Sequence, residues 1–255
     1  METVLLAIIL ISVVIGIVLA VNKILLKSKI ENSLKLINDG KYALAEKELK
    51  TFIDKNHESV YAHFLLAECY FKQDNYEWAL PEYNIVLKMN KYTEAYSEYD
   101  VRSRLANIFL HYKKSDEAQK EFILMSKIQP GNYHNYYEIG KIFQERNYTE
   151  NAYSYFKKAL SINPQHVDSL FKAGEISYQQ NRFEDAILEL QAALKENPDY
   201  HKAHFYLGRI HFDNKSFVDA AQEFEEASRD TEFRVKALAY KGRSLFEMTD
   251  YENAI

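Results

Sequence analysis

A step of 34 residues recurs through the second half of this chain and constrains its fold more than any other feature. Four of its seven glycines keep this step, at Gly140, Gly174, Gly208 and Gly242. Three of the four prolines and a series of alanines keep it too; they are Pro130, Pro164, Pro198, Ala152, Ala186, Ala220 and Ala254. A fixed period of this length predicts one supersecondary unit copied in tandem.

The residues in phase indicate what this unit is. Gly140 is followed by Phe143, Ala152, Phe156 and Pro164. A small residue lets two antiparallel helices approach closely where they cross, aromatic side chains fill the space beside that contact, and a proline ends the second helix. The pattern resembles the tetratricopeptide repeat (TPR) family, whose period is 34 residues. The resemblance implies an all-α fold, an α-solenoid of antiparallel helix pairs in a right-handed superhelix.

Extending the phase in both directions divides the chain into an anchor and an array. We expect an anchor over residues 1–25 and TPR repeats over residues 26–255, at about 26–59 (degenerate), 60–93, 99–132, 133–166, 167–200, 201–234 and 235–255 (partial). The first repeat is degenerate because Asn32 and Ser33 occupy a leucine position and a small-residue position. The extra residues Glu94 to Glu98 are expected to lengthen a helix. Asp250 to Ala254 match the start of a second helix in the last repeat.

The segment before the repeats is apolar. No residue from Thr3 to Asn22 is charged, and about twenty helical residues span about 30 Å, the thickness of a bilayer's hydrocarbon core. We predict a retained transmembrane helix. A cleaved signal peptide is the alternative, since Val18-Leu19-Ala20 could be a cleavage site, but such a peptide normally has a basic start and a shorter apolar run.

Lysines follow this apolar segment, at Lys23, Lys27, Lys29 and Lys35, and none precedes it. The positive-inside rule then predicts a single-pass membrane protein whose repeats lie in the cytoplasm, with a periplasmic array as the alternative. The single cysteine, Cys69, cannot form an internal disulfide, which is compatible with a reducing compartment.

Motifs for catalysis are missing from the sequence. It has no HExxH, paired CxxC, GxxxxGK[ST] or GxSxG motif, and we expect no enzyme activity, cofactor or metal. His201 and His204 have a spacing that could suit a metal. However, His204 and His211 occupy positions filled by Tyr136 and Phe143 in another repeat, which favours a role as core fillers. The net charge of −5 argues against a general nucleic-acid binder.

The resemblance implies that function lies on the concave face. In this family the second, fifth, ninth and twelfth positions of a repeat face the groove. Here they predict a groove that is aromatic along its length and basic toward its C-terminal end. The predicted partner-binding residues are Phe64, Phe71, Asn107, Tyr137, Lys141, Phe171, Tyr178, Lys202, Phe205, Arg209, Phe212, Lys236, Arg243 and Phe246. Aromatic residues and arginine are typical of binding hot spots. Alternatively, the fifth-position aromatics pack against the next repeat and stay buried.

These observations predict a membrane-tethered adaptor that binds a peptide or helix of a protein partner. The chain is similar to bacterial membrane-anchored TPR proteins that act as scaffolds. The groove lacks the Lys and Asn set with which one TPR subclass grips a C-terminal carboxylate. Leu238 and Leu245 would form an open apolar strip, and self-association through this end is therefore expected. The alternative is that the helix from about Val235 to Met248 caps the array. The alternative function is a regulatory or self-assembling arm of a larger envelope complex or enzyme.

Overall fold

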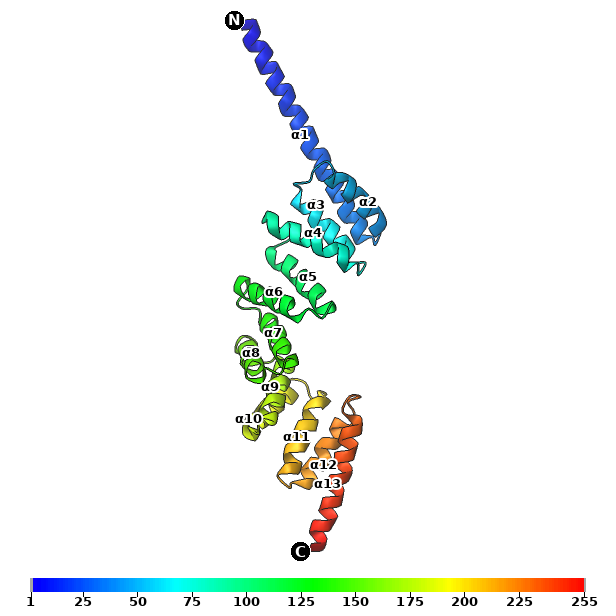
Figure 1. Ribbon diagram of the computed structural model, residues 1–255, viewed down its shortest axis with the longest axis vertical. Coiled ribbons are helices and arrows are strands. Elements are labelled where there is room, and N and C mark those ends of the chain that lie inside the picture. The colour runs from blue at the N-terminus through cyan, green and yellow to red at the C-terminus, as the bar shows by residue number, and fades with distance from the viewer. Residues whose placement is uncertain (1, 255) are drawn as a thin grey trace. The chain divides into compact units, whose positions relative to one another are not determined.

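The computed structural model describes the backbone of residues 2–254 and the side-chain environment of residues 10–22 and 24–249. Helices account for most of it (Figure 1). They are α1 Glu2–Asn38, α2 Tyr42–Ile53, α3 Val60–Phe71, α4 Tyr76–Met89, α5 Glu98–His111, α6 Ser115–Ile128, α7 Tyr133–Glu145, α8 Thr149–Ile162, α9 Val167–Gln179, α10 Phe183–Glu196, α11 His201–Asp213, α12 Phe217–Ala227 and α13 Arg234–Ala254. The predicted all-α fold is confirmed: in the described residues the extended structure amounts to one isolated bridge, between Thr93 and Tyr96.

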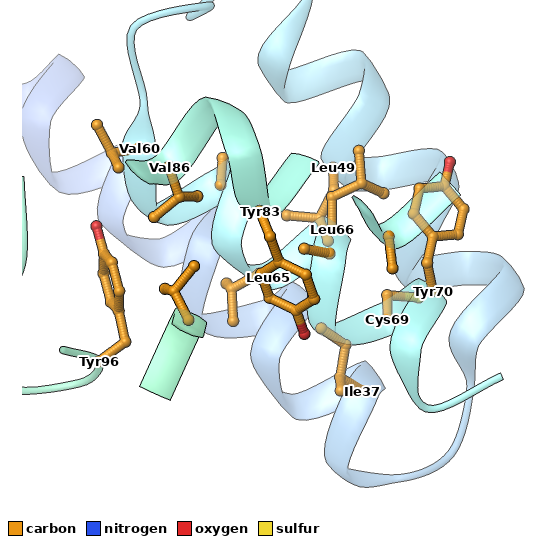
Figure 2. Close-up of a cluster of buried hydrophobic side chains, with 14 of the residues drawn as sticks. Ile37, Leu49, Val60, Leu65, Leu66, Cys69, Tyr70, Tyr83, Val86 and Tyr96 are labelled. Atoms are coloured by element: carbon orange, nitrogen blue, oxygen red, sulfur yellow. The ribbon is translucent and has the colours of Figure 1, made fainter. Parts of the chain in front are cut away.

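Two compact units make up the chain, Met1–Lys114 and Ser115–Ile255. The N-terminal unit contains α1 to α5, and the C-terminal unit contains α6 to α13. Within each unit, successive helices pack on one another and enclose a line of apolar side chains. Figure 2 shows this core in the N-terminal unit, where the buried Tyr83 ring lies beside Leu65 and Leu66.

In the C-terminal unit, the two helices of a repeat cross closely at a glycine. A Cβ atom added to Gly174 of α9 would lie 2.8 Å from Cγ of Leu190 in α10. A Cβ atom added to Gly140 would lie 2.7 Å from Cε1 of Phe156, and one added to Gly208 would lie 2.8 Å from Cε1 of Phe224. Distances below 3.0 Å leave no room for a side chain. The predicted role of these glycines at helix crossings is therefore confirmed.

The degenerate first repeat makes the same kind of contact with serine. Ser33 of α1 takes the glycine position and Leu49 of α2 the large apolar position, and both are buried. The Ser33 hydroxyl donates to the Lys29 carbonyl oxygen at 3.1 Å, so its polar atom is satisfied inside its own helix. Asn32, in the leucine position, points to the surface and donates to Glu48 at 2.8 Å. Both substitutions are thus compatible with a packed helix pair.

In the first six repeats a left-handed backbone residue separates the two helices. It falls at the fifteenth position, at Gly40, Asp74, Lys113, Asn147, Asn181 and Lys215, with φ between 55° and 74°. The next amide then bonds the carbonyl five residues back, as Tyr148 does to Phe143 at 2.9 Å. This bond satisfies a carbonyl group at the end of the first helix.

The last repeat lacks this turn, contrary to our expectation. Thr249 stands at the fifteenth position, and α13 continues through it to Ala254 as one helix. Threonine is β-branched and strongly disfavours the left-handed region, whereas most other repeats carry Gly, Asp or Asn there. The expected second helix at Asp250 to Ala254 is therefore not formed.

The extra residues between α4 and α5 also differ from the prediction. They form a loop instead of lengthening a helix. Asn90, with a left-handed φ of 50°, ends α4, and a capping box between Ser97 and Asp100 begins α5. In the loop the buried Tyr96 ring stacks on Phe64 with ring centroids 4.4 Å apart.

Helix α1 is continuous from the apolar segment into the first repeat, as the uninterrupted apolar pattern suggests. Its large apolar side chains between Leu10 and Val21 are all about half exposed or more, from 49% to 70%. By length and composition it is the one helix of the described residues that could cross a membrane.

Histidine–glutamate pairs link the two helices of two repeats at equivalent positions. His63 Nδ1 lies 2.6 Å from Glu82, and His204 Nδ1 lies 2.6 Å from Glu223. Both rings are largely buried between the helices, in agreement with the prediction that His204 fills the core. In the described residues no group of three or more potential ligands is placed to hold a metal ion.

We predict that Gly174→Leu destabilises the C-terminal unit, because its side chain must displace Leu190. Overpacking of this kind costs about 1–3 kcal/mol. Thermal unfolding followed by circular dichroism measures the effect. Gly242→Leu is the matched control, because no atom lies within 4 Å of a Cβ atom added there. It should leave the melting temperature unchanged or raise it through higher helix propensity. Equal melting temperatures for the two variants would disprove the crossing assignment.

A second prediction concerns pH. The hydrogen bond to Glu82 raises the pKa of His63 above its ordinary value of 6.5, although burial opposes it. A histidine whose pKa is higher in the folded state than in the unfolded state stabilises the fold fully at pH values below its unfolded-state pKa. This contribution is lost as the pH rises through its folded-state pKa. The urea midpoint should therefore fall between about pH 6 and pH 8. In Glu82→Gln this fall should be smaller. Identical pH profiles of wild type and variant would contradict the assignment.

Candidate partner-binding surface

The first helices of the C-terminal unit carry most of the predicted groove residues, on α7, α9, α11 and α13. Their fifth-position aromatics differ from the expectation of an open surface. Phe171 is 3% exposed and packs on Tyr200 and Tyr206, at centroid distances of 5.3 Å and 5.8 Å. Phe205 is 6% exposed and packs on Phe233 at 4.8 Å. Both rings fill the space between neighbouring repeats because the next repeat covers them. This agrees with the alternative prediction, in which the fifth-position aromatics stay buried.

Tyr137 is half-buried for the same reason. Its ring lies against His166 at 4.9 Å, and burial raises the pKa of its hydroxyl. Lys141 lies over this ring at 5.4 Å and forms an ion pair with Glu138 at 3.0 Å. Lys202 is likewise paired, with Glu232 at 2.7 Å. The positive charges of these two lysines are therefore already balanced within the chain.

A largely buried carboxylate lies at the centre of this surface. Glu175 of α9 accepts hydrogen bonds from the Gln144 amide, the Lys172 ammonium and the Tyr206 hydroxyl, at 2.9 Å, 2.8 Å and 2.6 Å. Burial by itself would raise the pKa of Glu175, but Lys172 and these hydrogen bonds lower it below its usual value. The residue stays charged and joins three successive repeats through α7, α9 and α11.

On α11 and α13, which follow Glu175 in the chain, two arginines stack on aromatic rings. The Arg209 guanidinium lies 4.5 Å from the Tyr240 ring centroid and 5.7 Å from that of Tyr178. Arg243 lies over Phe212 and Tyr240, at 5.2 Å and 5.3 Å. Contacts of this kind hold a guanidinium in place while its N–H groups at the ring edge remain available.

These arginines have no carboxylate partner among the described residues. The buried Nε of Arg209 lacks a hydrogen-bond acceptor. No ion pair of the described residues involves Arg209, Lys236 or Arg243. Phe246, on the same helix as Arg243, is 63% exposed. The C-terminal end of this surface therefore combines unpaired positive charge with an exposed aromatic side chain. We call Arg209, Lys236, Arg243 and Phe246 the basic patch.

The three remaining predicted residues belong to the N-terminal unit. Phe64 lines a hollow of about 450 Å³ together with Leu34, Ser103 and Arg104. Phe71 lies under the Arg104 guanidinium at 4.9 Å, and Asn107 is exposed. Unlike the basic patch, this region has its charge balanced, because Arg104 donates to Glu68 at 2.8 Å.

Sequence reasoning missed the residues that organise the surface. Lys172, Tyr206 and Tyr240 all occupy the sixth position of a repeat. This position directly follows the fifth and is not among the four positions predicted to face the groove. Their common position and their polar or aromatic character were visible in the sequence. What the sequence could not indicate is that Tyr206 bonds Glu175 and that Tyr240 supports both arginines.

Family comparisons agree with the repeat pattern. A tetratricopeptide repeat model matches residues 34–92 and 171–234, and a second tetratricopeptide repeat model matches residues 133–166. A comparison with curated proteins finds no match.

Several solved structures have a similar fold. PilF of Pseudomonas aeruginosa is 15% identical with a TM-score of 0.62, and the alignment covers 86% of this chain and 97% of that protein. YrrB, described as a TPR protein with an unusual peptide-binding site, is 15% identical with a TM-score of 0.58, covering 69% and 88%. MamA of Desulfovibrio magneticus RS-1 is 14% identical with a TM-score of 0.57, covering 69% and 96%. By its repeat models, its helix pairs and this likeness of fold, the chain belongs to the tetratricopeptide repeat family.

Proposed function

We propose that this protein is a membrane-tethered scaffold that holds an acidic segment of a protein partner on its basic patch. TPR proteins are interaction modules, and the fold includes relatives such as YrrB whose description names a peptide-binding site. The observation that carries the proposal is the set of cations without a carboxylate partner among the described residues, at Arg209, Lys236 and Arg243.

The energetics favour an anionic partner. Most other charges on this surface are neutralised, as Glu175 is by Lys172 and Lys202 is by Glu232. A guanidinium already fixed on a ring loses little conformational freedom when it binds a carboxylate. Hydrogen bonds to charged groups contribute about 1.5–3 kcal/mol each. Phe246 adds an exposed apolar anchor beside these charges.

The tether is proposed from α1. Its first turns carry a charge-free segment whose described side chains are exposed, and such a surface is costly in water. A bilayer would cover it. The same helix enters the first repeat without a break, so the array would be held close to the membrane surface. A cleaved signal sequence is the competing interpretation of this segment.

A self-assembling arm is the second candidate function. On α13 the side chains of Val235, Leu238 and Leu245 are exposed, and the space beside Gly242 is open. This apolar strip lies on the helix that also carries Lys236 and Arg243. A second copy of the chain could cover it in place of a different protein.

We predict that a photo-crosslinking residue at Phe246 captures a partner in intact cells, identified by mass spectrometry. The double variant Arg209→Gln with Arg243→Gln should lower the yield at least about tenfold, because two charge-assisted contacts are lost. Lys195→Gln with Arg229→Gln, which removes two exposed charges elsewhere, is the matched control and should keep the yield.

A crosslinker at Leu188 controls for position. Leu188 lies on α10, a second helix, and is 66% exposed, which matches Phe246. The same products from both positions would exclude the basic patch as the binding surface. A product consisting of two copies of this chain would instead favour the self-assembling arm.

A further prediction concerns topology. From the lysines after the apolar segment, the positive-inside rule predicts that the repeats lie in the cytoplasm. Protease added outside intact spheroplasts should therefore leave the repeats uncut, whereas protease added after lysis should digest them. Digestion in intact spheroplasts would overturn this orientation and place the array in the periplasm.

A further inference from the structure

A hollow of about 870 Å³ lies between α1 and the start of α3. Its lining includes Leu26, Ile30 and Leu34 of α1, together with Phe52 of α2 and Tyr61 of α3. Leu26 is 38% exposed, and Ile30 and Leu34 are partly buried against the core. The hollow therefore has an apolar surface that the described part of the chain leaves uncovered.

The three side chains from α1 form a single row. Leu26, Ile30 and Leu34 are spaced four residues apart, and residues at this spacing lie on one face of a helix. Rows of this kind are the ridges with which one helix packs against another. The row is about 12 Å long at 1.5 Å per residue, so a helix of about two to three turns would cover it.

The charges at the hollow balance one another. It is lined by Lys27 and Lys55 and by Glu31 and Glu58, which gives a formal charge of zero. Lys27 and Glu31 form an ion pair at 3.8 Å. An occupant that carried a charge toward this surface would bury it without a counterion, which is costly. The hollow therefore favours an apolar, uncharged face, unlike the basic patch.

The same face of α1 continues into the apolar segment. α1 is one unbroken helix (Figure 1), and at 3.6 residues per turn 18 residues make about five full turns. Ser12 therefore lies on the same face as Ile30, and Gly16 on the same face as Leu34. No atom lies within 4 Å of a Cβ atom added to Gly16, and small residues let membrane helices approach closely. One helix could thus follow this face of α1 from the bilayer into the hollow.

We propose that this hollow binds a helix of another membrane protein, at the point where that helix leaves the bilayer. Leu26 lies about 6 Å along α1 from Asn22, the end of the charge-free segment. The occupant continues its own transmembrane helix by about two to three turns, and its face toward Leu26, Ile30 and Leu34 is apolar and carries no charge. A parallel second copy of α1 is disfavoured, because it would bring its own Lys27 to the lysines of the hollow. The assignment rests on the proposed membrane tether and does not involve the basic patch.

The test places the photo-crosslinking residue p-benzoylphenylalanine at Tyr61 of the full chain in intact cells. Tyr61 lines the hollow, and the substitution keeps an aromatic ring. Mass spectrometry of the crosslinked peptide should identify a membrane protein, and the peptide should lie within about ten residues of the end of a transmembrane helix. Tyr112, which directly follows α5 and is 45% exposed, is the matched control position and should not give this product.

Leu26→Glu should lower the yield at Tyr61 about tenfold, because it places a charge without a partner against the apolar occupant. Leu25→Glu is the matched control. Leu25 is the neighbouring residue of α1, is 55% exposed and does not line the hollow. It adds the same charge at nearly the same depth and should keep the yield. Both leucines are solvent-accessible, and an unchanged melting temperature checks that both variants fold.

Four results would overturn the helix site: equal products at Tyr61 and Tyr112, equal effects of the two variants, a product from a soluble protein, or a product made of two copies of this chain. The last of these would assign the hollow to self-association. A chain that stays in the membrane fraction after carbonate extraction but gives no product at Tyr61 would overturn the site alone. A chain released by carbonate would overturn the tether as well.

Discussion

The contact on which this structure depends is the close approach of two helices at a small residue. Where Gly174 meets Leu190, the missing side chain lets the backbones approach until a Cβ atom would have no space. Dispersion between closely packed atoms and removal of apolar surface from water both favour this contact. Because it recurs every 34 residues, it also sets the orientation of each first helix relative to its second.

That orientation determines the surface. Residues at the sixth, ninth and twelfth positions of neighbouring repeats meet across the first helices, which is how Gln144, Glu175 and Tyr206 come together. The same repetition places Arg209 and Arg243 on Tyr240. The fifth position is covered by the next repeat, so Phe171 and Phe205 are buried and stabilise the array.

Much of the fold could be predicted from the sequence because one contact is repeated. The helices α7, α9 and α11 begin at Tyr133, Val167 and His201, where the phase places them. The failures lie where the repetition breaks. The loop before Ser97 and the unbroken α13 depend on a capping box and on Thr249, which are single local features. The burial of Phe171 depends on its neighbour in the next repeat, which position within one repeat does not reveal.

The central claim is that unpaired cations on the first helices hold an anionic partner. Its most direct test is the affinity of the captured partner segment for the purified chain, measured by calorimetry at low and high ionic strength. The account predicts that affinity falls steeply with added salt, and that this dependence is largely lost in Arg209→Gln with Arg243→Gln. An affinity that does not change with salt, or an equal salt dependence in the variant, would contradict it.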